Sequence, residues 1–232
     1  MRRWITVQVS LVQLCILGCF LSPLAAQDAQ QVQKLVESLY PKNDRLKEIR
    51  MGEIVHELGI HEGSRVADVG CGGGEFSVVL SHVVGQSGKV YCEDIVDKKD
   101  WGLGRAKRNF KKQHIKNAVL IHGDPDNPKL PQDSFDAVLI VNAYHEMPKY
   151  RDMLAHIKEA LKPKGHLVIL DNTPLRTANR PREKQTANHV LSSDFAAREL
   201  QEAGFQLVDR SNTFIDNPDS ESAHWLIAVE RP

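Results

Sequence analysis

Glycines and an acid lie close together in the stretch from Arg65 to Phe76. The residues before Gly70 are mostly apolar, which predicts a buried strand, and Gly70, Gly72 and Gly74 predict a tight turn into a helix. Glycine lets a backbone approach a ligand closely, and the start of a helix offers free N–H groups. This turn is therefore a candidate ligand site, with Asp68 two residues before it.

A second acidic site follows the predicted strand 89–92. Asp94 ends this strand, where a carboxylate can accept two hydrogen bonds from a ribose diol, as it does in dinucleotide-binding enzymes. Glu93 takes that role if the register shifts by one residue. A surface acid without function is the remaining alternative for Asp94.

Polar residues also follow the predicted strand 135–141. Asn142 comes directly after it, and His145 is a candidate general base because imidazole titrates near neutral pH. The alternative for His145 is a histidine that is simply hydrogen-bonded in its loop. His189, before the last predicted helix, is a further candidate for an acceptor pocket, or a histidine without such a role.

Strands and helices alternate along most of the chain, which predicts a parallel sheet covered on both faces. Ligands of such sheets bind at the carboxyl ends of the strands, where the residues above are placed. One helix is predicted from Asn43 or Asp44 to Gly59, and another over 101–113. The stretch 173–190 is predicted to be irregular. Further strands are predicted at 65–69, 118–121, 166–170, 205–208 and 225–229.

Length and composition fit one globular domain. The chain has 232 residues, and 30 basic residues balance 30 acidic ones, so the formal net charge is zero. A neutral chain gives no support for electrostatic capture of nucleic acid. Of the four cysteines, Cys71 and Cys92 lie at strand ends beside the glycine turn. We expect these two to be small buried apolar residues and not a disulfide framework.

The first 26 residues have the layout of a secretory signal peptide. Arg2 and Arg3 precede an apolar run, and the small residues Ala25 and Ala26 follow it, so we place cleavage after Ala26. Retention of the segment as a membrane anchor is one alternative. Lipoprotein processing at Cys19 is another, since 16–19 loosely matches a lipoprotein cleavage box. We therefore divide the chain into a signal peptide (1–26), a leader (27–42) and one domain (43–232), and expect export to the periplasm or the extracellular space.

The glycine turn with its preceding acid resembles motif I of class I S-adenosylmethionine-dependent methyltransferases. The stretches 88–95, 123–124, 133–136 and 161–169 resemble later motifs of that family in the same order, with Lys164 in place of a usual glycine. The resemblance implies an α/β, Rossmann-like sheet of seven mostly parallel strands, with helices on both faces and an antiparallel last strand. It also implies S-adenosyl-L-methionine as cofactor. The residues that it assigns to cofactor binding are Asp68, Gly70, Cys71, Gly72, Gly74, Asp94, Ile95, Asp124 and Asn142.

Within this resemblance, Asp94 would bind the ribose, Ile95 would pack on adenine and Asp124 would accept a hydrogen bond from the adenine amine. Asp171 and Asn172 resemble a pair found in cation-dependent catechol O-methyltransferases. The partner acid of that metal site is replaced here by Asn142 or a neighbour, so we expect no metal ion.

We therefore expect a methyltransferase that acts on a small-molecule or lipid-like acceptor, with His145 as the candidate catalytic residue. The segment 142–146 lacks the prolines of base-amine methyltransferases, which argues against a nucleic-acid acceptor. A membrane contact is expected only if the N-terminal segment is retained. Two alternatives stay open: an exported nucleoside-binding protein without catalysis, and a nicotinamide-dependent oxidoreductase on the same sheet.

Overall fold

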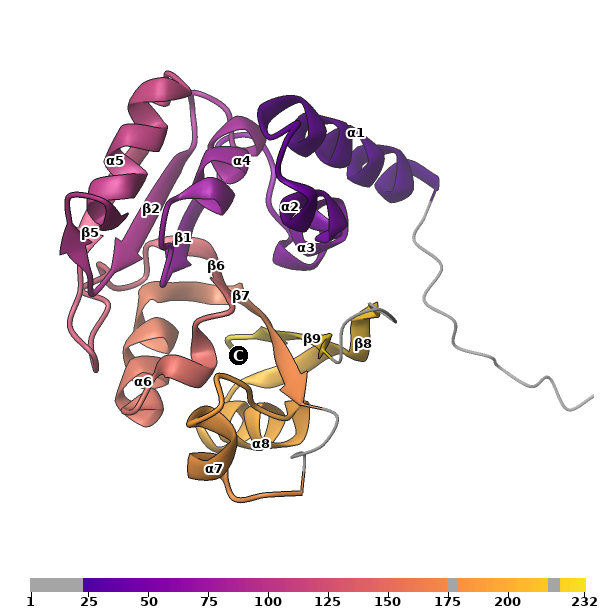
Figure 1. Cartoon of the computed structure of the whole chain (residues 1–232), viewed down its shortest axis with the longest axis vertical. Coiled ribbons are helices and arrows are strands. Elements are labelled where there is room, and N and C mark those ends of the chain that lie inside the picture. Colours follow the sequence, from indigo (N-terminus) through magenta and orange to yellow (C-terminus); the bar gives the residue numbers. More distant parts are fainter. Residues whose placement is uncertain (1–22, 175–178, 217–221) are drawn as a thin grey trace, which may run out of the picture.

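The computed structural model describes residues 23–174, 179–216 and 222–232 (Figure 1). Its main sheet has seven strands in the order β5-β2-β1-β6-β7-β9-β8. These are β1 (Arg65–Val69), β2 (Lys89–Asp94), β5 (Ala118–His122), β6 (Phe135–Val141), β7 (Leu161–Pro174), β8 (Gln206–Asp216) and β9 (Ser222–Glu230). The pairs from β5 to β7 are parallel, and β9 is antiparallel to both of its neighbours. The predicted sheet, including its antiparallel last strand, is confirmed.

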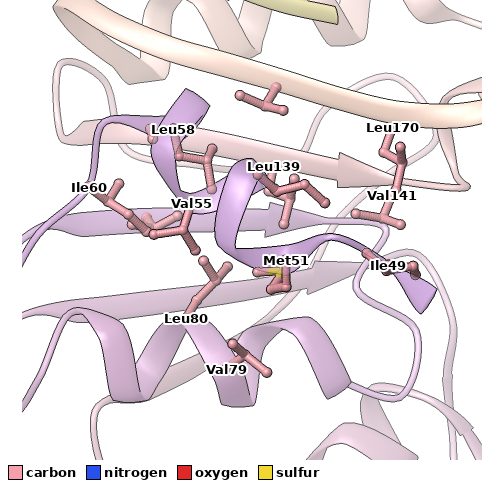
Figure 2. Close-up of a cluster of buried hydrophobic side chains, with 14 of the residues drawn as sticks. Ile49, Met51, Val55, Leu58, Ile60, Val79, Leu80, Leu139, Val141 and Leu170 are labelled. Atoms are coloured by element: carbon pink, nitrogen blue, oxygen red, sulfur yellow. The ribbon is translucent and has the colours of Figure 1, made fainter. Parts of the chain in front are cut away.

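Helices cover both faces of this sheet. They are α1 (Pro23–Leu39), α2 (Asp44–Glu48), α3 (Met51–Leu58), α4 (Glu75–Val83), α5 (Leu103–Lys112), α6 (Tyr150–Ala160), α7 (Arg182–Thr186) and α8 (Ser193–Glu202), with a short 3₁₀ helix η1 (Tyr144–Glu146). The central strands alternate their side chains between two cores. Leu139 and Val141 pack with the α1–α4 side, and Val138 and Ile140 pack with α6 and α8. Figure 2 shows the first core, where Met51 and Val55 of α3 face Leu80 of α4 and Leu139 of β6.

The predicted helix from Asn43 to Gly59 is two helices in the structure. The side chain of Asn43 does cap α2, accepting from the N–H of Leu46 at 3.2 Å, and Gly59 ends α3 in the left-handed conformation. Between them, Ile49 adopts extended backbone and buries its side chain in the core. Tertiary packing therefore interrupts a segment whose apolar spacing alone predicted a continuous helix.

The helix predicted over 101–113 begins two residues later than expected. Trp101 and Gly102 form β4 (Trp101–Gly102), which pairs antiparallel with β3 (Asp97–Lys98) before α5 starts. Gly102 has φ +57°, and a Cβ there would lie 2.0 Å from the carbonyl oxygen of Val96. This close approach requires glycine and turns the chain out of the helical path.

The segment 173–190 also contains more regular structure than predicted, since β7 continues to Pro174 and α7 occupies Arg182–Thr186. The predicted signal peptide lies outside the described residues up to position 22, and residues 23–26 belong to α1. Helix α1 packs on α3, and Val36 is buried in the core. In the described part of the chain, no helix combines the length and the apolar character needed to cross a membrane. The proposed domain boundaries stay a prediction.

Candidate functional site

A cavity of about 610 Å³ opens at the carboxyl ends of β1, β2 and β6. The loop between β1 and α4 forms one wall, the end of β2 another, and the segment after β6 a third. Six residues assigned to the cofactor from the sequence line it: Gly70, Cys71, Gly72, Asp94, Ile95 and Asn142. Most of the cofactor-binding residues predicted from the sequence therefore line one cavity.

The glycine loop is built to bring backbone close to this cavity. Gly70 has φ +72°, and a Cβ there would lie 2.5 Å from the Cβ of Ala143 after β6. Gly72 has φ +52° with open space where a side chain would extend. Larger residues at these positions would strain the turn or fill the cavity, so the loop leaves its backbone accessible to a ligand.

Asp94 connects the end of β2 to the glycine loop. One carboxylate oxygen accepts the N–H of Gly72 at 2.9 Å, and the other accepts the N–H of Val96 at 2.8 Å. The carboxylate borders the cavity and keeps lone pairs for further donors, because each oxygen can accept more than one hydrogen bond. This geometry fits the predicted ribose contact, which stays a prediction.

Glu93 also borders the cavity but is more deeply buried than Asp94. Its Oε1 is buried and has no hydrogen-bond partner among the described residues, and burial raises the pKa of its carboxyl group to about 8. A Cβ on Gly123 would lie 1.8 Å from this oxygen, so glycine is needed there to accommodate Glu93. Glu93 and Asn142, whose buried Oδ1 also has no partner, offer two polar atoms that a ligand in the cavity can satisfy.

Three residues assigned to cofactor binding lie outside the cavity wall: Asp68, Gly74 and Asp124. Asp68 is buried beneath the loop, where it accepts the hydroxyl of Ser77 at 2.6 Å. Gly74 begins α4 and packs on α5, since a Cβ there would lie 3.0 Å from that of Ala106. Asp68 and Gly74 therefore support the loop from behind.

Asp124 is exposed and forms an ion pair with Lys129 at 3.0 Å. Its backbone pairs with Asn127 in an isolated bridge. The predicted adenine contacts of Asp124 and Ile95 remain predictions.

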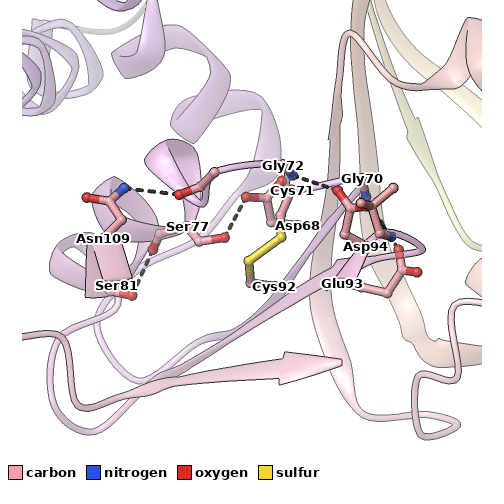
Figure 3. The surroundings of a disulfide bond; sticks show 12 residues. Asp68, Gly70, Cys71, Gly72, Ser77, Ser81, Cys92, Glu93, Asp94 and Asn109 are labelled. Atoms are coloured by element: carbon pink, nitrogen blue, oxygen red, sulfur yellow. Dashed lines mark hydrogen bonds between the residues drawn. A yellow bond between two sulfur atoms is a disulfide. The ribbon is translucent and has the colours of Figure 1, made fainter. Parts of the chain in front are cut away.

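Cys71 and Cys92 are buried as expected, but the expectation that they form no disulfide is wrong, because the two are bonded to each other (Figure 3). The parallel register of β1 and β2 places Val69 opposite Glu93, and the N–H of Cys71 donates to the carbonyl oxygen of Glu93 at 2.9 Å, which brings Cys71 beside Cys92 within β2. The Cα atoms of the two cysteines are 5.5 Å apart, within the range that a disulfide spans. The bond joins the glycine loop to β2 at the cavity, which Cys71 lines.

His145 is buried in η1 and lies behind the cavity wall, which its neighbour Glu146 helps to form. Its Nδ1 donates to Oδ1 of Asp171 at 2.7 Å, and its Nε2 lies 3.2 Å from Oε1 of Glu146. Burial by itself lowers the pKa of His145, but the hydrogen bond and charge of Asp171, together with Glu146, raise it above the usual value. The catalytic role of His145 stays a prediction.

Asp171 thus takes a role that the sequence did not suggest. It is fully buried, and besides the His145 ring it accepts the backbone N–H of His145 at 3.0 Å and that of Asn172 at 2.7 Å. The carboxylate fixes η1 against the end of β7.

Several residues of the cavity were missed by sequence reasoning. Helix α2 with its cap contributes Asn43, Arg45 and Leu46, strand β4 contributes Trp101, and η1 contributes Glu146. The helix cap at Asn43 was recognisable, but its proximity to the glycine loop depends on how α2 folds back over the sheet. Glu146 had a local signal, since it directly follows the candidate His145.

Known proteins with similar sequences are methyltransferases. Residues 60–216 match the family model described as a methyltransferase domain. A demethylmenaquinone methyltransferase of Staphylococcus saprophyticus is 30% identical over 152 residues, which are 62% of this chain and 63% of the relative. One from Geobacillus sp. is 27% identical over 62% of this chain and 64% of its own. The matched region thus spans somewhat under two thirds of these relatives.

Solved structures share the fold at lower identity. A SAM-dependent methyltransferase from Aquifex aeolicus has a TM-score of 0.68 at 23% identity, covering 88% of this chain and 99% of that one. The [4+2]-cyclase SpnF also has a TM-score of 0.68, at 14% identity over 90% and 97% of the two chains. The family model covers most of this chain and includes every strand from β1 to β8, so the chain belongs to the methyltransferase-domain family.

Proposed function

We propose that this protein transfers a methyl group from S-adenosyl-L-methionine to a small-molecule or lipid-like acceptor. The observation that carries the proposal is the cavity at the strand ends, where the glycine loop and the Asp94 carboxylate meet in a member of the methyltransferase-domain family. Two buried oxygens, on Glu93 and Asn142, have no hydrogen-bond partner in the part of the chain that the structure describes and are available to donors of a bound cofactor. These features fit a nucleoside with a charged amino-acid tail.

Asp94 would hold the ribose diol, and the backbone of Gly70 to Gly72 would lie against the methionine portion. S-adenosyl-L-methionine supplies an electrophilic methyl group on a positively charged sulfur. In-line transfer of that group depends on alignment and on exclusion of water more than on acid–base residues. The task of this chain's residues is therefore to orient two reactants in one cavity.

The side of the cavity after β6 would receive the acceptor. Ala143, Met147, Pro148 and Met153 give this side an apolar surface, and Glu146 adds a carboxylate. The curated relatives are named for a demethylmenaquinone substrate, and a geranyl diphosphate C-methyltransferase of Streptomyces coelicolor shares the fold with a TM-score of 0.65 at 12% identity, over 91% of this chain and 99% of its own. An apolar acceptor with one polar group is in line with this lining.

We also propose that the protein is exported. The basic start and apolar run before Ala26 support this, and the Cys71–Cys92 disulfide adds an independent argument, because such bonds persist in oxidising compartments. Retention of the segment as an anchor, or lipidation at Cys19, would keep the domain at a membrane surface.

A second candidate function is binding or catalysis without methyl transfer. The fold similarity to the [4+2]-cyclase SpnF shows that proteins of this architecture include one named for a different reaction. The two candidates share the cavity and differ in whether S-adenosyl-L-homocysteine is released.

The test combines binding with turnover. Calorimetry of the full chain should show binding of S-adenosyl-L-methionine and none of NAD. A panel of quinols, phenols, prenyl compounds, amines and thiols should then contain an acceptor that produces S-adenosyl-L-homocysteine, with Asp94→Ala as the control. Binding without turnover on any acceptor would favour the second candidate, and binding of NAD alone would refute the first.

A further inference from the structure

Two histidines and a glutamate converge beside the cavity. His145 and Glu146 belong to η1, and His189 follows α7. The Nε2 of His145 lies 3.2 Å from Oε1 of Glu146, and Nδ1 of His189 contacts the same oxygen. One possible ligand atom from each side chain lies within 4.8 Å of the other two. Two separate chain segments thus bring three donor atoms to one place.

The ring of His145 is oriented by a buried carboxylate. Asp171 accepts from its Nδ1 at 2.7 Å and from its backbone N–H at 3.0 Å. Because Nδ1 carries the hydrogen, the neutral ring presents the lone pair of Nε2 toward Glu146. Metal-binding histidines almost always donate their second ring N–H to a carboxylate, carbonyl or water in this way.

Contacts of neighbouring residues hold the segment that carries His189 in place. Arg182 of α7 pairs with Glu199 of α8 at 2.7 Å, and Glu199 accepts the hydroxyl of Tyr144 in η1 at 2.7 Å. Gln185 accepts the N–H of Ser192 at 2.7 Å, which closes the other end of the segment. The segment that carries His189 is therefore tied to η1 by a buried network.

The cluster carries negative charge that a cation could balance. In the described part of the chain, the Glu146 carboxylate forms ion pairs with His145 and His189 and with no other residue. Neutral imidazoles would leave two lone pairs and a carboxylate facing one another, with a second carboxylate behind His145. A divalent cation satisfies all three donors and balances the two negative charges.

We propose that His145, Glu146 and His189 bind a divalent transition-metal ion such as Zn²⁺, with Asp171 as the positioning residue for His145. Two imidazoles and one carboxylate are a ligand set found in zinc enzymes and in related iron sites, and three protein ligands leave a coordination position open. Mg²⁺ fits poorly, because it prefers oxygen ligands. Glu146 also lines the cavity, so the ion would lie at the cavity wall.

This site differs from the metal site considered from the sequence, which would use Asp171, Asn172 and Asn142 or a neighbour and for which no metal ion is expected. Asp171 contributes here as a partner of His145 and not as a ligand. The cluster uses none of the residues assigned to the cofactor, so cofactor binding and Zn²⁺ binding can be tested separately, although the cluster includes His145, the candidate catalytic residue.

The test is calorimetric titration of the full chain, first stripped with a chelator, with ZnCl₂ and separately with MgCl₂. We expect one equivalent of Zn²⁺ to bind with micromolar affinity or tighter, and no binding of Mg²⁺. His189→Asn should weaken Zn²⁺ binding by about 100-fold or more, and Asp171→Asn by roughly 10- to 100-fold. The side chain of His189 is 75% exposed and asparagine tolerates its φ of +57°, so His189→Asn should fold normally.

His156→Asn is the matched control. His156 is an exposed histidine 3.7 Å from Glu159, but no other histidine among the described residues joins that pair, so Zn²⁺ affinity should not change. Binding at the N-terminal thiols Cys15 and Cys19 would survive His189→Asn and is thereby distinguished. Absence of Zn²⁺ binding by the wild type, or equal affinity in wild type and His189→Asn, would overturn the proposal. Circular dichroism of each variant checks that it is folded.

Discussion

The side chain of Asp94 accepts a hydrogen bond from the glycine loop and lines the cavity, so its substitution tests the cofactor assignment directly. Asp94→Ala removes the acceptors of a ribose diol and also releases the N–H of Gly72. We expect a loss of about 2–3 kcal/mol in binding free energy, which is roughly a 30- to 150-fold weaker Kd for S-adenosyl-L-methionine. Asp94→Asn should lose less, because one acceptor oxygen remains. Isothermal titration calorimetry measures both.

Asp97→Ala serves as the control for this substitution. Asp97 is an exposed acid three residues further on, in β3, so its removal changes local charge without touching the glycine loop. Glu93→Gln examines the neighbouring carboxyl, whose pKa is raised to about 8 by burial. If Glu93→Gln weakens binding and Asp94→Ala does not, Glu93 is the ribose ligand.

Asp68 gives a prediction for stability against pH. Burial raises the pKa of its carboxyl group from 3.8 to about 7, although the Ser77 hydrogen bond opposes this shift. Between these values the unfolded chain loses the proton and the folded chain keeps it, so the free energy of unfolding falls as pH rises toward 7. Asp68→Asn keeps an acceptor for the Ser77 hydroxyl and has no carboxyl group to ionise. Between pH 4 and pH 8, its free energy of unfolding should therefore rise relative to that of wild type by about 2 kcal/mol or more.

Urea denaturation of both proteins at the two pH values, without cofactor, measures that difference. A constant gap between wild type and Asp68→Asn across this range would show that Asp68 ionises normally in the folded protein.

Residue types and spacing were enough to locate the cavity but not to complete it. Gly70, Gly72 and Asp94 carry strong local signals, because strand ends and glycine turns are readable over a few residues. The contact between His145 and Asp171 joins positions 26 residues apart and depends on the pairing of β6 with β7. Asp124 follows a strand end as its motif requires, yet it forms a local bridge with Asn127 and is not among the residues that line the cavity.

At the level of elements, the parallel strands were predictable and the short pieces were not. Continuous apolar runs such as β6 reflect burial on both faces, which the sequence expresses directly. The pair β3–β4 has two residues a strand, and the break between α2 and α3 contains neither glycine nor proline. Such features depend on packing that no short window of sequence encodes.

The disulfide between the glycine loop and β2 makes a prediction at this level. Cys71 and Cys92 are 21 residues apart, and closing a loop of that size restricts the unfolded chain. Replacing both with serine should therefore lower the free energy of unfolding by roughly 3 kcal/mol. Thermal denaturation of the double variant and of wild type under oxidising conditions measures this loss.

Mass spectrometry of the non-reduced, trypsin-digested protein provides the control. It should yield one peptide pair joined through Cys71 and Cys92. Alkylation of both cysteines before any reductant is added would contradict the bond.

For the whole molecule, the proposed export is tested at the N-terminus. If the segment up to Ala26 is a cleaved signal peptide, protein isolated from its native host should begin near Gln27. N-terminal sequencing of the secreted or periplasmic fraction measures this directly. Intact Met1 in a soluble cytosolic fraction would refute export, and a lipid-modified Cys19 would replace cleavage after Ala26 by anchoring.

The stability of the Cys71–Cys92 disulfide and the binding of a ligand in the cavity should depend on each other. Cys71 lines the cavity that the glycine loop shapes, so a ligand that prefers the bridged loop must, by thermodynamic reciprocity, stabilise the bridge by the same factor. An occupied domain would then resist thiol reductants longer than an empty one. If the protein is exported as proposed, an oxidising compartment would keep the loop bridged whether or not the cavity is occupied.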